Sequence, residues 1–222
     1  MIRSGKVRYI FSKIEINLII NFILLFATIQ CNKNDLSANN FEELERVQEE
    51  NQNNTEKKIF NFEKISCIEG FANEFPCKDY DLLSWIPLSF FGSESANDNW
   101  GWTDSNSKRE FVLQGLNDGL AFLDITDPQK VILIGKLLSA TDPSDWRDVK
   151  IYNNYAFVVS EASSHGLQVF NLNRLLDSDE FKIFNEDYIA NDFGNAHNIA
   201  INISTGFAYI LGSALYEGGP VF

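Results

Sequence analysis

The sequence has few basic residues, and this shortage limits the partners that it can bind. It contains 18 lysines and arginines against 31 aspartates and glutamates, which gives a formal net charge of -13. Binding to nucleic acid depends on side chains that neutralise phosphates, and for this chain the electrostatic contribution is repulsive. We therefore expect no nucleic-acid partner.

Histidine is also scarce, and the common catalytic motifs are missing. The chain has only 2 histidines. It contains no glycine-rich phosphate loop, no nucleophile elbow and no paired zinc motif. The sequence therefore favours a protein that is not an enzyme, and it predicts no cofactor, with a divalent metal as the alternative.

No hydrophobic run is long enough to span a bilayer comfortably. The longest one extends over residues 16–29, and basic residues precede it: Arg3, Lys6, Arg8 and Lys13. A charged segment followed by about 7 to 15 apolar residues is the layout of an export signal. We expect residues 1–30 to form a signal helix. The alternative, a permanent anchor, would place Lys13 and Glu15 inside the membrane.

Only three cysteines occur, and the first follows the apolar run. Cys31 is followed by polar residues, so the segment resembles a bacterial lipoprotein signal in which this cysteine is acylated. Gln30 departs from that pattern, because a small residue usually precedes the cysteine. The alternative is an ordinary cysteine near a cleavage site. With lipidation, we expect membrane attachment at the cell envelope, and without it a secreted protein.

The other two cysteines, Cys67 and Cys77, enclose nine residues rich in turn formers. An even pair in an exported chain predicts a disulfide, with two reduced buried thiols as the alternative. Residues 31–58 contain few apolar side chains, so we expect a flexible tether. The folded domain then extends over residues 59–222.

One strand-turn-strand phrase occurs twice and begins a third time, at Phe111, Phe157 and Ala208. The spacings of 46 and 51 residues are typical of repeats that bury apolar faces against their neighbours. We expect an all-β fold of β-propeller-like antiparallel blades, incomplete at about two to three blades.

The alternation of side chains supports this interpretation. Leu120 and Phe122 would lie on one face of a strand, and Ala121 and Leu123 on the other, so both faces are apolar. The pair Asn153-Asn154 predicts a hairpin turn. By the same comparison of repeats, Asp148 corresponds to His197. Residues 97–104, with two tryptophans, are expected to form an aromatic turn.

Several phrases together resemble the choice-of-anchor B proteins, which contain LVIVD-type repeats: WGWTD, GLNDGLAFLDITDP, LIGKL, WRDVKIYNNYAFVVSEASSHGLQVFNL and AHNIAIN. The resemblance covers residues 67–222. It implies a β-propeller-like domain that is secreted or attached to the surface, and it implies no particular activity. Proteins of that family are longer, so we expect this chain, which ends in GGPVF, to be truncated.

Polar residues in the repeats provide one candidate metal site. Asp148, Glu161, His165 and His197 would form a carboxylate-imidazole site if equivalent positions converge. Two histidines and a carboxylate would suit a metal-dependent hydrolase that uses Asp148, His165 and His197. The alternative is that these side chains cap strand ends and turns.

Two further ligand types have candidate residues. Trp100 and Trp102 could stack on a carbohydrate, or they could belong to the core. Aspartate-rich turns could bind calcium or simply be solvated, and they include Asp98, Asp104, Asp127 and Asp142. The leading hypothesis is an exported, lipid-anchored binding module for a protein or carbohydrate ligand, and the metal-dependent hydrolase is its rival.

Overall fold

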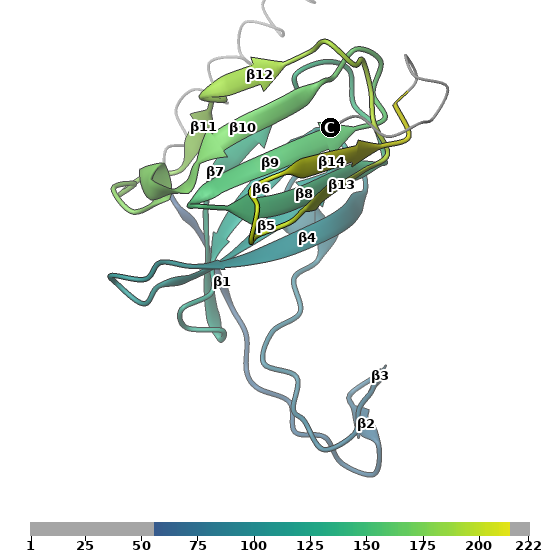
Figure 1. The fold of residues 1–222 in the computed structure, drawn as a ribbon. Coiled ribbons are helices and arrows are strands. Elements are labelled where there is room, and N and C mark those ends of the chain that lie inside the picture. Colours follow the sequence, from purple (N-terminus) through teal and green to yellow (C-terminus); the bar gives the residue numbers. More distant parts are fainter. Residues whose placement is uncertain (1–55, 214–222) are drawn as a thin grey trace, which may run out of the picture. The chain divides into compact units, whose positions relative to one another are not determined.

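The computed structural model describes residues 56–213, and this part of the chain is all-β (Figure 1). Its strands lie in antiparallel sheets, with one parallel pair and two short 3-10 helices, η2 (Leu88–Phe90) and η3 (Leu172–Leu175). The all-β, antiparallel prediction is therefore confirmed. The expected signal segment 1–30, Cys31, the tether as far as residue 55 and the chain end at 214–222 lie outside the described residues.

The first sheet is a meander of four consecutive strands with two additions. It consists of β4 (Ala96–Thr103), β5 (Glu110–Leu116), β6 (Gly119–Asp124) and β7 (Lys130–Leu138). Both β1 (Lys58–Asn61) and β11 (Lys182–Phe184) pair with β7, the former antiparallel and the latter parallel. Gly135 lies under β11, where a Cβ atom would come within 2.1 Å of the Lys182 carbonyl oxygen.

The second sheet repeats this meander. Its strands are β8 (Arg147–Tyr152), β9 (Tyr155–Ser160), β10 (Leu167–Asn171) and β12 (Tyr188–Ala190). The β13 (Asn198–Ile201) and β14 (Ala208–Leu211) strands form a hairpin that begins a third copy. Asn153 and Asn154 connect β8 to β9 with φ angles of 48° and 62°, so the predicted hairpin turn is confirmed.

One expectation about secondary structure is wrong. The phrase NDNWGWTD was expected to be an aromatic turn, but it lies in β4, a strand paired with β5. Strand β4 lies at the edge of its sheet and most of its side chains are exposed, so the apolar alternation that marks a buried strand is missing.

Apolar side chains cover both faces of the first sheet, as the alternation predicted. Leu120 and Phe122 of β6 face a core shared with the second sheet, where Phe122 and Phe170 stack with ring centroids 4.6 Å apart. Ala121 and Leu123 face the opposite side, where Phe91 and its neighbours cover them. A third apolar cluster lies between the second sheet and the β13–β14 hairpin. Each sheet is therefore stabilised mainly by burial against the next one.

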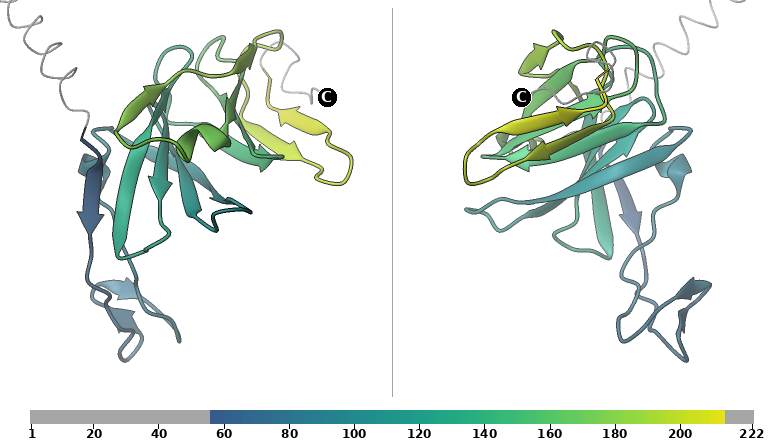
Figure 2. Two further views of the ribbon diagram at one scale, coloured as in Figure 1. Left: turned by 90° about the vertical axis from the view of Figure 1, so that its left-hand side faces the viewer. Right: turned by 45° about the vertical axis from the view of Figure 1, so that its right-hand side comes forward.

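The first strands of the three units, β4, β8 and β13, lie side by side (Figures 1 and 2). An aspartate on each of the first two accepts a hydrogen bond from the backbone of the next unit. Asp98 Oδ2 lies 3.5 Å from Val149 N, and Asp148 Oδ2 lies 2.8 Å from Ile199 N. Both contacts join residues 51 positions apart, so this aspartate contact repeats with the units.

The same contacts correct the expected correspondence between repeats. Asp148 pairs across its hairpin with Val159, and Asn198 pairs with Leu211, so Asp148 corresponds to Asn198. Arg147 is then the counterpart of His197. A shift of one residue matters, because neighbouring side chains on a strand point to opposite faces.

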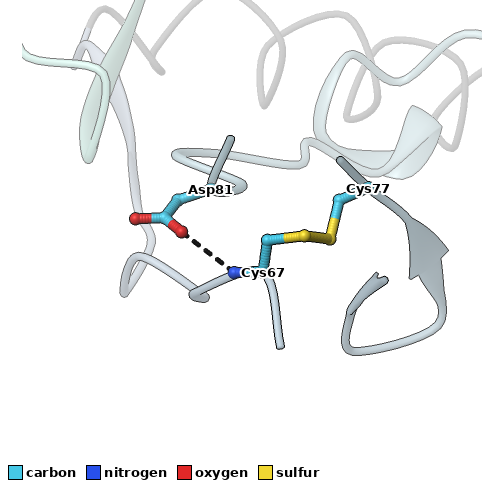
Figure 3. The surroundings of a disulfide bond; sticks show 3 residues. All are labelled: Cys67, Cys77 and Asp81. Atoms are coloured by element: carbon cyan, nitrogen blue, oxygen red, sulfur yellow. Dashed lines mark hydrogen bonds between the residues drawn. A yellow bond between two sulfur atoms is a disulfide. The ribbon is translucent and has the colours of Figure 1, made fainter. Parts of the chain in front are cut away.

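Residues 62–86 form an extension that runs away from the sheets (Figures 1 and 2). It carries a short hairpin of β2 (Phe71–Ala72) and β3 (Phe75–Pro76). A disulfide joins Cys67 to Cys77, whose Cα atoms are 5.9 Å apart, and Asp81 accepts a hydrogen bond from Cys67 N (Figure 3). Residues 62–86 are called the disulfide arm below.

Candidate functional site

A polar pocket of about 360 Å³ lies where β4, β8 and β13 meet, and it is called the inner-strand pocket below. Four carboxylate- or amide-bearing residues line it: Asn97, Asp98, Asp148 and Asn198. Trp146 and His197 form part of its wall and are about half exposed. Each of the three units therefore contributes to one concave site that has both polar and apolar surface.

An acidic pair with a lysine between its members lies in the pocket wall. Lys150 Nζ is 3.0 Å from Asp98 Oδ2 and 2.5 Å from Asp148 Oδ1. Burial raises the pKa of the Asp148 carboxyl, and the neighbouring Asp98 raises it further, against the opposing effect of Lys150. The pKa of Lys150 is raised because its two carboxylate partners outweigh the effect of its burial.

These charges also have a structural task. Asp148 accepts from Ile199 N, which belongs to a buried residue, and from Asn198 Nδ2 at 3.3 Å. Since Asp98, Asp148 and Lys150 satisfy one another, the pocket offers a ligand mainly its amides, its imidazole and one indole face.

The indole comes from Trp146, the residue directly before β8. Its backbone carbonyl accepts hydrogen bonds from Ser160 Oγ at 2.9 Å and from Glu161 N at 3.1 Å. These bonds hold the main chain and do not involve the indole ring. The ring is 52% exposed and its centroid lies 6.0 Å from that of His197. Glu161 Oε1 contacts Nδ1 of His197, so the carboxylate orients the imidazole.

His165 has different surroundings from the other residues that were expected to bind a metal. It is fully buried, and its Nε2 lies 2.9 Å from Arg147 Nη1. Arginine only donates, so Nε2 accepts this bond, and Nδ1 donates to the Gly166 carbonyl at 3.0 Å. Both ring nitrogens of His165 are thus used within the fold.

The structure does not bring together the four residues expected to hold a metal. Glu161 and His197 are in contact, Asp148 binds Lys150 and the backbone of β13, and His165 binds Arg147. Among residues 56–213, no group of three or more histidine, cysteine, aspartate or glutamate side chains is placed to ligate a metal. The geometry of this part of the chain therefore gives the hydrolase alternative no ligand set.

The two tryptophans named from the sequence have different environments. Trp102 is buried against Phe111, with ring centroids 5.1 Å apart, and its Nε1 donates to Asn154. Trp100 is 43% exposed, but the ammonium of Lys150 lies 4.5 Å from its ring centroid. Trp102 therefore belongs to the core, and a cation already covers Trp100.

The aspartate-rich turns are stabilised by their own backbone and hydroxyl groups. Asp104 Oδ2 accepts from Ser107 N at 2.7 Å and from its Oγ at 2.6 Å, and these bonds lower the pKa of Asp104. Asp127 accepts from Gln129 N in the same manner. Asp98 belongs to the inner-strand pocket. Asp142 contributes its carbonyl to Ser139 rather than a carboxylate to a cluster.

Comparison of the chain with protein-family models, with curated proteins and with solved structures finds no match. The resemblance to choice-of-anchor B proteins therefore stays a prediction. Trp146 lines the pocket but was not predicted from the sequence to be a site residue. The sequence does place this tryptophan immediately before a repeat strand, where it can border the junction of two units.

Proposed function

We propose that this protein is an exported binding module whose inner-strand pocket takes a carbohydrate. The observation that carries the proposal is the half-exposed indole of Trp146 at the edge of a polar pocket. A sugar ring presents an apolar C–H face to an aromatic ring and hydroxyl groups to amides and imidazoles. Asn97, Asn198 and His197 provide such polar groups around that face.

The arrangement of units supports a β-propeller-like interpretation of the domain. The two meanders and the third hairpin would be successive blades, with β4, β8 and β13 as their inner strands. The repeated aspartate contact and the apolar clusters between neighbouring units are consistent with such blades. A ligand site where the inner strands meet would then lie near the central axis of the propeller-like arrangement.

The cellular location remains a proposal from the sequence. The chain would be exported by residues 1–30 and attached to a membrane through a lipid at Cys31. The disulfide between Cys67 and Cys77 is consistent with an oxidising compartment. The structure contains no helix within residues 56–213 with the length and apolarity to cross a bilayer.

Lipid attachment is tested by metabolic labelling with a fatty-acid analogue. The natural chain should incorporate the label, and Cys31→Ser should not, because the thiol is the proposed site of acylation. Label in both proteins, or in neither, would contradict attachment at Cys31. Cys67→Ser combined with Cys77→Ser is the control and should retain the label.

Carbohydrate binding is tested with soluble monosaccharides and disaccharides by isothermal titration calorimetry and saturation-transfer NMR. Trp146→Ala should weaken binding about tenfold or more, since loss of about 1.4 kcal/mol of contact energy changes the dissociation constant by that factor. Trp85→Ala is a matched control, because that residue is similarly exposed and does not line the inner-strand pocket. The absence of saturable binding to any sugar, or equal loss in both variants, would contradict the proposal.

A further inference from the structure

The disulfide arm displays large apolar side chains to solvent. Five of them are between 44% and 68% exposed: Ile68, Phe71, Tyr80, Leu83 and Trp85. Single exposed apolar residues are common on protein surfaces, but here five large ones fall within the short arm, and larger apolar surfaces are typical of interaction sites.

Covalent and polar contacts hold this arm in one conformation. The Cys67–Cys77 disulfide closes its hairpin, and Ile65 pairs with Leu82 across its base. Lys64 Nζ binds Asp81 Oδ2 at 2.8 Å. The apolar side chains are therefore presented by a constrained element, which reduces the entropy cost of binding a partner.

An apolar groove of about 450 Å³ adjoins the arm and is called the outer groove below. One wall comes from the base of the arm, through Leu83 and Trp85, and the other from the face of the first sheet, including Val112, Leu123 and Val131. The rings of Phe75 and Trp85 lie 6.1 Å apart, so the β2–β3 hairpin contacts one residue of the groove wall.

A polar group lies within this apolar surface. Ser84 lines the outer groove, and its buried Oγ has no hydrogen-bond partner among the described residues. Because this oxygen is buried, it adds no exposed hydroxyl to the groove, whose accessible surface is mainly apolar.

Charges around the apolar surface are mainly acidic. Between residues 63 and 81 the chain has five acidic side chains, Glu63, Glu69, Glu74, Asp79 and Asp81, against two basic ones, Lys64 and Lys78. One of the two lysines is already paired with Asp81. The disulfide arm is therefore net acidic and favours a basic partner, and complementary charge contributes most to the association rate and to specificity.

We propose that the disulfide arm and the outer groove form a docking surface for a basic, amphipathic peptide segment of another protein. The apolar face of the segment would occupy the groove beside Leu83 and Trp85, and its lysines or arginines would lie against the acidic side chains of the arm. An anionic lipid surface and a second copy of this acidic chain fit the acidic arm less well, because each presents like charge.

The probe is a fluorescent 14-residue peptide of leucine and lysine with helical spacing of the leucines, and a scrambled isomer is its control. Fluorescence anisotropy should show binding to the protein that weakens about tenfold or more between low and high salt. The double variant Phe71→Ser with Leu83→Ser should lose binding. Ile203→Ser with Phe207→Ser removes two apolar side chains that are more exposed than Phe71 and Leu83, from the loop after β13, and should retain it.

Several results would overturn the proposal. Equal binding of the peptide by both double variants, equal binding of the scrambled isomer, or no binding would each contradict it when circular dichroism shows folded variants. Binding to phosphatidylcholine and phosphatidylglycerol vesicles that depends on Phe71 and Leu83, without peptide binding, would replace it by membrane contact. A dimer that dissociates in the arm variant would replace it by self-association. Trp146→Ala should leave peptide binding unchanged, because that residue belongs to the inner-strand pocket.

Discussion

Replacing Arg147 by alanine is expected to lower the free energy of unfolding by about 3 to 5 kcal/mol. The side chain is 1% exposed and connects the two sheets. Its Nε donates to the Leu116 carbonyl at 3.0 Å, its Nη2 to Ser139 Oγ at 2.9 Å and its Nη1 to His165 Nε2 at 2.9 Å. The substitution leaves these buried acceptors without a donor and opens a cavity among them.

Urea denaturation followed by circular dichroism measures this effect. Arg174→Ala is the matched control, since that guanidinium is partly exposed and binds the Asn185 carbonyl and Asp187 at the surface. It should cost about 1 to 2 kcal/mol, because it loses a surface ion pair and the contact of its guanidinium with the Phe170 and Phe184 rings. A loss for Arg147→Ala no larger than that of the control would contradict the assigned role in joining the sheets.

Acid is expected to destabilise the fold before the carboxylates of Asp118 and Asp124 are protonated, because their pKa values are lowered. Burial lowers the pKa of His165 from 6.5 to about 4, and the charge of Arg147 lowers it further against the hydrogen bond to the Gly166 carbonyl. Protonation of Nε2 would remove the acceptor of the Arg147 bond and place two cations together. The native state therefore requires the neutral imidazole.

The direction of the pH dependence follows from the proton counts of the two states. Between pH 6.5 and 4 the unfolded chain binds a proton at His165 that the folded chain does not. The contribution of His165 is complete above pH 6.5 and is lost progressively down to about pH 4, with a total of about 3 kcal/mol. Asp118 and Asp124 have lowered pKa values, and their contributions are lost at still lower pH.

Thermal unfolding between pH 7 and pH 4 tests this expectation. His165→Gln should reduce the fall in stability over that range, because glutamine has no proton to bind. His197→Gln makes the same change at a half-exposed histidine and should keep the fall seen in the parent protein. The expectation is contradicted if His165→Gln retains the full pH dependence, or if His197→Gln abolishes it.

The two surfaces proposed here differ in chemistry and in place. The inner-strand pocket combines amides, an imidazole and the Trp146 indole where three units meet. The outer groove is apolar and lies on the face of the first sheet that carries Leu123 and Val131, next to the disulfide arm. A module with both could hold a carbohydrate at one site and a protein at the other.

Much of the fold was predictable from local patterns. Strand β6 has apolar side chains at successive positions, and this predicted a sheet buried on both faces. Asn153-Asn154 predicted its hairpin because asparagine tolerates positive φ. The β4 strand was missed, since its exposed polar side chains and Gly101 have no apolar alternation.

Little of the candidate site could be predicted, because its geometry depends on how units pack. The comparison of repeats aligned Asp148 with His197, but its structural counterpart is Asn198, one residue further on. Because neighbouring side chains on a strand point to opposite faces, this shift of one residue changes which side chains can meet. His165 and His197 appeared equivalent as candidate ligands, although one is buried against Arg147 and the other is half exposed beside Glu161.

The sequence by itself determined the class of fold, the repeat and its turns, because these depend on the period of apolar residues and on the conformational preferences of asparagine and glycine. Tertiary structure decided which polar groups meet. Asp98 accepts a hydrogen bond from Val149, and Asp148 accepts one from Ile199, across unit boundaries. Arg147 donates to the Leu116 carbonyl on the first sheet. Such contacts join residues about 30 to 50 positions apart, and burial between units, rather than any local pattern, brings them together.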